Sequence, residues 1–265
     1  MSSTEGTIHG SRGAQCGRSS GRAPHVRLFA TAASMLSLLL AGACGPQRTD
    51  GATDNATRGV TVTTSNALPA SDPVPAGIAG VGHHGENVYD MAKAGKWLAA
   101  RASTDSLRAA MTAIPDTGAA QTRSAHSARA QLESTLASLD RAVTSRNSTD
   151  ALRASNHVTE LGARLAAPYN PRVPADVTLL DYYGRELEVW AAAKDADKLR
   201  STAAAMRQTW DALRAQVEAR GGGAEAARFE ALVARVQSAT TPAAYGALAG
   251  PVLAEVDNLE AVFTK

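Results

Sequence analysis

The segment Trp97-Leu-Ala-Ala-Arg-Ala-Ser-Thr-Asp-Ser-Leu-Arg-Ala-Ala-Met-Thr-Ala-Ile114 decides the fold. The residues that we expect to face the core recur at alternating spacings of three and four residues: Trp97, Ala100, Thr104, Leu107, Met111 and Ile114. This period places them on one face of an α-helix. Alanine, leucine and arginine fill much of the remainder and favour helix. We therefore expect a helix with one buried face.

The same spacing recurs in further segments to the end of the chain. Gly, Pro and N-capping residues separate these segments. Eight helices are predicted, near residues 85–93, 97–115, 123–145, 149–167, 176–194, 197–219, 224–239 and 242–263. The connections between them are short, which makes successive helices antiparallel neighbours. The predicted fold class is all-α, an antiparallel helical bundle of about eight helices.

The strongest interruption is Pro168-Tyr-Asn-Pro-Arg-Val-Pro174, with three prolines in seven residues. It divides the bundle into a first half at 84–167, a linker at 168–175 and a second half at 176–265. An aromatic-bearing helix precedes both Ala92-Lys-Ala-Gly-Lys-Trp97 and Ala193-Lys-Asp-Ala-Asp-Lys-Leu199. This echo suggests a duplicated four-helix unit. The alternative is that any two alanine-rich helices align.

The N-terminal region has the parts of a secretory signal. Arginines precede an apolar run, Leu28-Phe-Ala-Thr-Ala-Ala-Ser-Met-Leu-Ser-Leu-Leu-Leu-Ala-Gly-Ala-Cys44, which ends in small residues. The run is shorter than the ~20 residues that a membrane-spanning helix needs. We expect residues 1–43 to be a signal peptide. Its first 27 residues are long for a signal, which indicates either an upstream start assignment or an extended basic region.

The end of this apolar run, Ala41-Gly-Ala-Cys44, resembles the lipobox of bacterial lipoproteins, except that Ala41 stands where Leu is usual. The resemblance implies cleavage before Cys44 and a diacylglycerol on its sulfur. Because Gly45 stands where inner-membrane lipoproteins carry Asp, the resemblance favours the outer membrane. Two acyl chains hold a protein on a membrane stably, whereas one chain binds it marginally. The expected location is the cell envelope, with the domain in the periplasm or at the surface.

Residues 44–83 are predicted to be a disordered tether. They are rich in Gly, Thr, Ala, Pro and Asp and contain few large apolar side chains. Such a segment cannot bury enough apolar surface to offset the entropy of ordering it. Cys16 and Cys44 are the only cysteines in the sequence, so the predicted domain has no internal disulfide.

The net charge and the motif content of the sequence limit the classes of function that we expect. Four arginines and one glutamate lie within residues 1–43, so the chain from Cys44 onward is near −1 rather than +2. Nucleic-acid binding needs clustered Lys and Arg, and we expect no such partner. From Cys44 onward the sequence has no Gly-rich phosphate loop, Gly-x-Ser-x-Gly elbow or His-Glu-x-x-His zinc pair. We predict no catalytic residues, no enzyme activity and no resident cofactor.

The densest set of metal-ligand types is His83, His84, Glu86 and Asp90. Imidazoles and carboxylates suit transition metals. The segment Gly82-His-His-Gly-Glu86 resembles the Gly-x-His-x-x-Glu motif of imelysin-like envelope proteins, one residue short. The resemblance implies a metal site. The alternative is a solvated helix entry in which an acidic side chain complements the positive end of the helix.

Met91 and His157 fall on the first and fourth predicted helices, which are neighbours in an up-down-up-down bundle. This ligand pair resembles that of cytochrome b562-like bundles, and the resemblance implies non-covalent haem. The alternative is that Met91 fills a gap in the core and that His157 faces water. A carboxylate di-iron site needs Glu-x-x-His on two helices, and His157-Val-Thr-Glu160 has the reverse order.

The most chemically mixed helix is Asp181-Tyr-Tyr-Gly-Arg-Glu-Leu-Glu-Val-Trp190. Its aromatic residues Tyr182, Tyr183 and Trp190 stand out in a chain that is 4% aromatic. They either fill the core of the second half or line a ligand groove or partner surface, where Tyr and Trp are over-used.

The sequence therefore predicts a lipid-anchored envelope protein with a non-catalytic binding or interaction role. Its partner would be another envelope protein or a small ligand. The alternative is a periplasmic bundle that binds a transition metal or haem.

Overall fold

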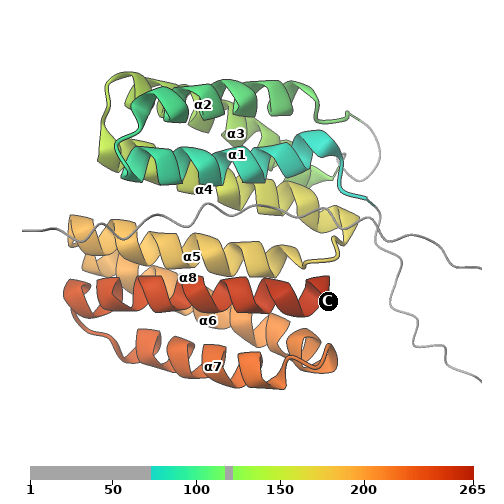
Figure 1. Cartoon of the computed structure of the whole chain (residues 1–265), viewed down its shortest axis with the longest axis vertical. Helices are drawn as coiled ribbons and strands as arrows, with labels where there is room; N and C mark the ends of the chain where they lie inside the picture. Colours follow the sequence, from blue (N-terminus) through green and yellow to red (C-terminus); the bar gives the residue numbers. More distant parts are fainter. Residues whose placement is uncertain (1–72, 117–121) are drawn as a thin grey trace, which may run out of the picture. The chain divides into compact units, whose positions relative to one another are not determined.

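The structure is a computed structural model that describes residues 73–116 and 122–265. Within those residues it contains eight antiparallel α-helices and no strand, which confirms the predicted fold class (Figure 1). The first four helices are α1 (Ala76–Lys93), α2 (Trp97–Thr112), α3 (Arg123–Thr144) and α4 (Ser148–Ala166). The last four are α5 (Ala175–Ala193), α6 (Ala196–Ala219), α7 (Gly223–Ser238) and α8 (Pro242–Thr264). Cys44 and the predicted signal peptide lie outside the described residues.

Side-chain oxygens set the starts of four helices. Each accepts a hydrogen bond from a backbone N–H three residues on, which the helix itself cannot satisfy. The capping residues are Thr122, Asn147, Asp195 and Thr241. The sequence predicted helix starts at all four of these places, with capping residues at the last three, and the structure confirms them.

The first helix departs from its predicted bounds. It begins at Ala76, directly after Pro75, whereas the sequence predicted a start near residue 85. Ile78 and Val81 in its first turns are buried in the core of the first half. The tether predicted over 44–83 was therefore wrong for residues 76–83. The glycines that suggested a flexible segment instead allow α1 to approach its neighbours closely.

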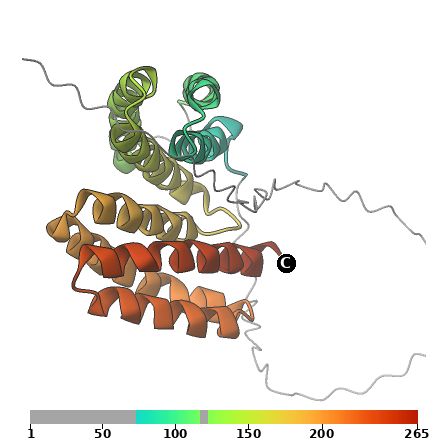
Figure 2. The ribbon, with the colours of Figure 1, turned by 60° about the vertical axis from the view of Figure 1, so that its left-hand side comes forward.

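The helices form two four-helix halves, each around its own core (Figures 1 and 2). In the first half α1 packs on α2 and α4, and α3 packs on α2 and α4. The second half repeats this arrangement, with α5 and α7 each packed on α6 and α8. The shared arrangement agrees with two four-helix units, and their origin by duplication stays a prediction.

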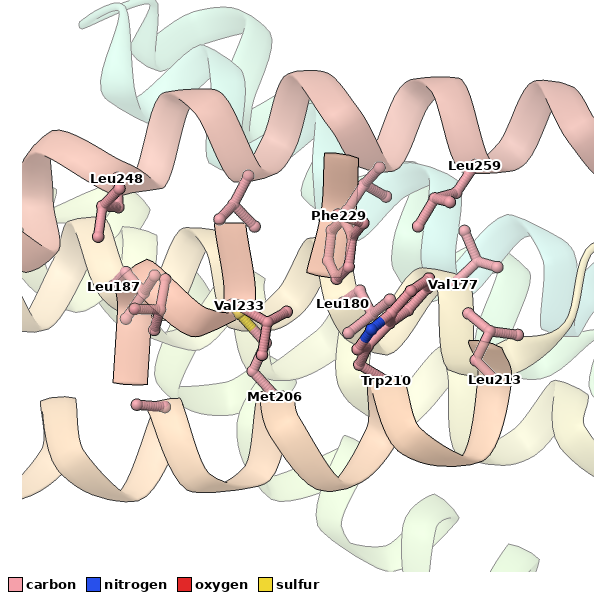
Figure 3. Close-up of a cluster of buried hydrophobic side chains, with 14 of the residues drawn as sticks. Val177, Leu180, Leu187, Met206, Trp210, Leu213, Phe229, Val233, Leu248 and Leu259 are labelled. Carbon is pink, nitrogen blue, oxygen red and sulfur yellow. The ribbon is translucent and has the colours of Figure 1, made fainter. Parts of the chain in front are cut away.

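Trp210 lies at the centre of the second core (Figure 3). Its ring centroid is 4.8 Å from that of Phe229, and its indole N–H donates to Glu230 Oε2 over 2.8 Å. Arg207 also binds this carboxylate, with 2.7 Å between Nη1 and Oε1. Hydrogen bonds from Arg207 and Trp210 lower the pKa of Glu230 to about 2. The one polar atom of the buried indole ring is thus satisfied at the edge of the core.

The proline-rich segment connects the two halves. A single 3-10 turn, η2 (Ala167–Tyr169), ends at Asn170, whose φ of 46° is left-handed. Arg172 then donates hydrogen bonds to the last three backbone carbonyls of the chain, at 2.8–2.9 Å. These bonds fix the linker against the C-terminal end of α8, because C-terminal carbonyls have no partner within their own helix.

Helices α1 and α4 meet through glycines. A Cβ added at Gly85 would lie 2.9 Å from Val158 Cγ1, and one added at Gly162 would lie 3.0 Å from the backbone nitrogen of Gly82. There is no room for a methyl group at either position. Because both residues are glycines, the two backbones can lie unusually close.

We expect Gly85→Ala to lower the free energy of unfolding by about 1–3 kcal/mol, because a new methyl group would overpack the α1–α4 contact. Gly82→Ala is the matched control on the same helix, since its Cβ would meet no atom within 4 Å. That variant should gain roughly 0.5–1 kcal/mol from helix propensity. Urea denaturation followed by circular dichroism measures both. Equal stability changes in the two variants would contradict the close contact.

Candidate functional site

The two halves contact each other through polar side chains. Asn156 of α4 is fully buried, and its Nδ2 donates to Tyr182 O over 3.1 Å and to Glu186 Oε1 over 3.0 Å, both on α5. Buried amides carry a large desolvation cost unless they are hydrogen-bonded. This amide therefore fixes how α4 lies against α5, its neighbour across the two halves (Figure 1).

Helix α1 also reaches the second half. The hydroxyl of Tyr89 donates to Glu188 Oε2 over 3.2 Å, and Lys93 Nζ lies 2.6 Å from Glu188 Oε1. The guanidinium of Arg185 lies 4.9 Å from the centroid of the Tyr89 ring and pairs with Asp181 over 3.0 Å. We call Tyr89, Asn156, Arg185, Glu186 and Glu188 the polar interface.

Glu86 is the titratable group of interest beside the polar interface. Burial raises its pKa to about 7. The charge of Arg185 opposes this shift, whereas Asp181 of α5, Glu260 of α8 and Asp90 of α1 itself add to it. Glu86 therefore changes charge near neutral pH, next to the contact between the halves.

A groove of about 660 Å³ lies next to the polar interface. Its walls come from α3 and α4 of the first half and from α5 and the start of α6 in the second. Its lining includes Arg141, Arg153, His157, Tyr182, Glu186, Trp190 and Lys198. Four helices from both halves thus build one concave site.

Trp190 is the half-buried aromatic wall of this groove. Its indole N–H donates to Glu186, whose other oxygen accepts from Asn156. Burial raises the pKa of Glu186. The Arg153 guanidinium and Lys198 Nζ lie 4.8 and 5.6 Å from the indole centroid, within the range of cation–π attraction. The polar interface therefore sets the orientation of the ring that faces the groove.

The structure separates the three predicted aromatic residues. Tyr182 and Trp190 line the groove, whereas Tyr183 packs against the second core. Trp190 also contacts that core with part of its surface. Both interpretations of the sequence thus describe part of the helix.

The structure places the two predicted haem ligands in different surroundings. His157 lines the groove, where its Nδ1 lies 2.9 Å from Glu160 Oε2. Met91 packs against the core of the first half and does not line the groove. The position of Met91 matches the alternative, in which it fills a gap in the core.

The structure places all four predicted metal ligands on α1. His83 is exposed and shares a hydrogen bond with Asn87, and its ring centroid lies 5.2 Å from that of His84. Glu86 lies near the charges of α5, and Asp90 is exposed. Across residues 73–116 and 122–265, no group of three His, Cys, Asp or Glu side chains is placed to hold a metal ion.

Sequence reasoning missed the groove's cations. Arg141, Arg153 and Lys198 belong to three different helices, and their spacing along the chain gives no signal that they share a site. They could have been found only by combining the helical periods of α3, α4 and α6 with the packing of the two halves.

Comparisons of the chain with protein-family models, with curated proteins and with solved structures found no match. None of the helices in the described part of the chain has the length and apolar character needed to cross a membrane.

Glu86→Gln tests the raised pKa. A carboxyl whose folded-state pKa lies above its unfolded value loses stability as the pH rises through that interval. Between pH 5 and pH 8 the natural chain should therefore lose on the order of 1–3 kcal/mol more unfolding free energy than the Gln variant. Urea denaturation at both pH values measures the difference, with Glu133→Gln, at an exposed position of α3, as the control. Parallel pH curves for the natural chain and Glu86→Gln would contradict a buried, titrating Glu86.

Proposed function

We propose that this protein is a non-catalytic binding protein whose ligand occupies the groove between its halves. The observation that carries the proposal is the groove itself, which is formed by α3, α4, α5 and α6 around an oriented Trp190. Its volume of about 660 Å³ falls within the range of small-molecule sites, roughly 300–1,000 Å³. A few polar groups beside an aromatic wall are the usual composition of such sites.

The hydroxyl groups of the groove support a binding role over catalysis. Ser138 Oγ donates to the Ser134 carbonyl over 3.1 Å, and Ser145 Oγ donates to the Arg141 carbonyl over 2.8 Å. These serines bond their own helix rather than a base, whereas a serine nucleophile needs a base within hydrogen-bond reach.

We further propose that the protein is attached to the cell envelope through a lipid on Cys44. The support is the signal-like N-terminal region and its lipobox resemblance, with Cys44 outside the described residues. The groove would then face the periplasm or the cell exterior, and its ligand would be an envelope component or a small solute there.

Filling the groove tests the binding role. Ser138 is exposed on α3 and lines the groove, whereas its neighbour Ala137 is exposed and does not. A library of envelope-derived and soluble metabolites, screened by thermal shift, should contain compounds that stabilise the natural chain, because a ligand stabilises the state that binds it. Ser138→Trp should abolish that shift and Ala137→Trp should retain it. No shift with any compound, or the same shift in both variants, would contradict binding in the groove.

Cys44→Ser tests the membrane attachment. The natural chain should be recovered in the membrane fraction and should incorporate a labelled fatty acid when expressed in a bacterium. The variant should incorporate none and should leave the membrane fraction after alkaline washing, since two acyl chains provide the stable anchor. Labelled variant protein, or unlabelled natural protein, would contradict lipidation at Cys44.

A further inference from the structure

We propose that the ligand of the groove carries an oxyanion, a carboxylate or a phosphate, held between Arg141 of α3 and Lys198 of α6. This inference rests on the binding role proposed above and adds the chemical class of the ligand. Arg141, Arg153 and Lys198 line the groove together with the carboxylates of Asp150 and Glu186.

Neither carboxylate neutralises Arg141 or Lys198. Asp150 accepts a hydrogen bond from Asn147 Nδ2 over 2.7 Å at the start of α4 and lies 4.0 Å from Arg153. The two oxygens of Glu186 accept from Asn156 and from the Trp190 indole. The acidic groups of the groove are thus directed to other donors.

Arg141 and Lys198 are correspondingly free to bind a ligand. Arg141 donates only to uncharged groups, the Ala137 carbonyl over 3.3 Å and Ser138 Oγ over 3.2 Å. Lys198 Nζ has the Trp190 ring as its contact. Within the described residues, neither cation has a carboxylate at ion-pair distance. By contrast, Arg207, which lies beside the second core, forms ion pairs with both Glu230 and Asp211.

Two of the groove's cations contact the same aromatic ring. Arg153 and Lys198 lie 4.8 and 5.6 Å from the Trp190 centroid, so two like charges share one indole. Their repulsion is only partly offset by the quadrupole of the ring. An oxyanion bound at this place would neutralise the positive charge and accept charge-assisted hydrogen bonds, which are stronger than neutral ones. The rest of the ligand would lie along Trp190 and Tyr182.

The test uses the full chain and three probes: citrate for carboxylates, inorganic phosphate for phosphates and glucose as a neutral compound of comparable size. Thermal shift and isothermal titration measure binding to the natural chain and to Arg141→Gln/Lys198→Gln. Both substituted side chains are exposed, so the double variant should fold normally. The matched control is Arg101→Gln/Lys96→Gln, which removes two exposed cations of the first half that do not line the groove.

We expect citrate or phosphate to bind the natural chain, and the groove double variant to weaken that binding roughly tenfold or more, since hydrogen bonds to charged groups contribute about 1.5–3 kcal/mol. The control double variant should bind as the natural chain does. Binding to citrate alone identifies a carboxylate ligand, and binding to phosphate alone identifies a phosphate; either result supports the proposal.

Equal weakening in both double variants, or none in either, would place the anion elsewhere and overturn the proposal. Binding of glucose but of neither anion, abolished by Ser138→Trp, would also overturn it while leaving the binding role intact. If no probe binds, the oxyanion proposal fails, and the wider metabolite screen then decides the binding role separately.

Discussion

The groove depends on the way the two halves are held together. Each half completes its own apolar core, and hydrogen bonds and charges help to fix the contact between α4 and α5 and between α1 and α5. Such groups require defined distances and directions, and a partner left unpaired in a buried contact is costly. Asn156 links this contact to the site, because the same amide binds Glu186, which in turn orients Trp190. The site and the junction of the halves are therefore one hydrogen-bonded system.

Most of the fold could be predicted from local signals. The three-and-four spacing, the capping oxygens at Asn147, Asp195 and Thr241, and the prolines after residue 167 act over a few residues. The start of α1 could not be read in this way. Its glycines lower helix propensity when the sequence is considered alone, and only the approach of α4 gives them a packing role.

The site was predicted only in part, because neighbouring residues on a helix face different surroundings. Tyr182 and Tyr183 are consecutive and so point about 100° apart, which sends one to the groove and the other toward the second core. The sequence grouped them because they are alike in chemistry. Arg141 and Lys198 were missed for the opposite reason. They lie far apart in the chain and line the same groove only after both halves have folded.

The glycine contact between α1 and α4 differs in its physics from the contact between the halves. It is a steric fit of backbones and apolar atoms, with Gly85 against Val158 and Gly162 against Gly82. Dissolved electrolyte screens exposed charge pairs such as Lys93 with Glu188 and leaves steric fits largely unaffected. At high salt concentration the Lys93–Glu188 part of the contact between the halves should therefore weaken, while α1 stays packed on α4.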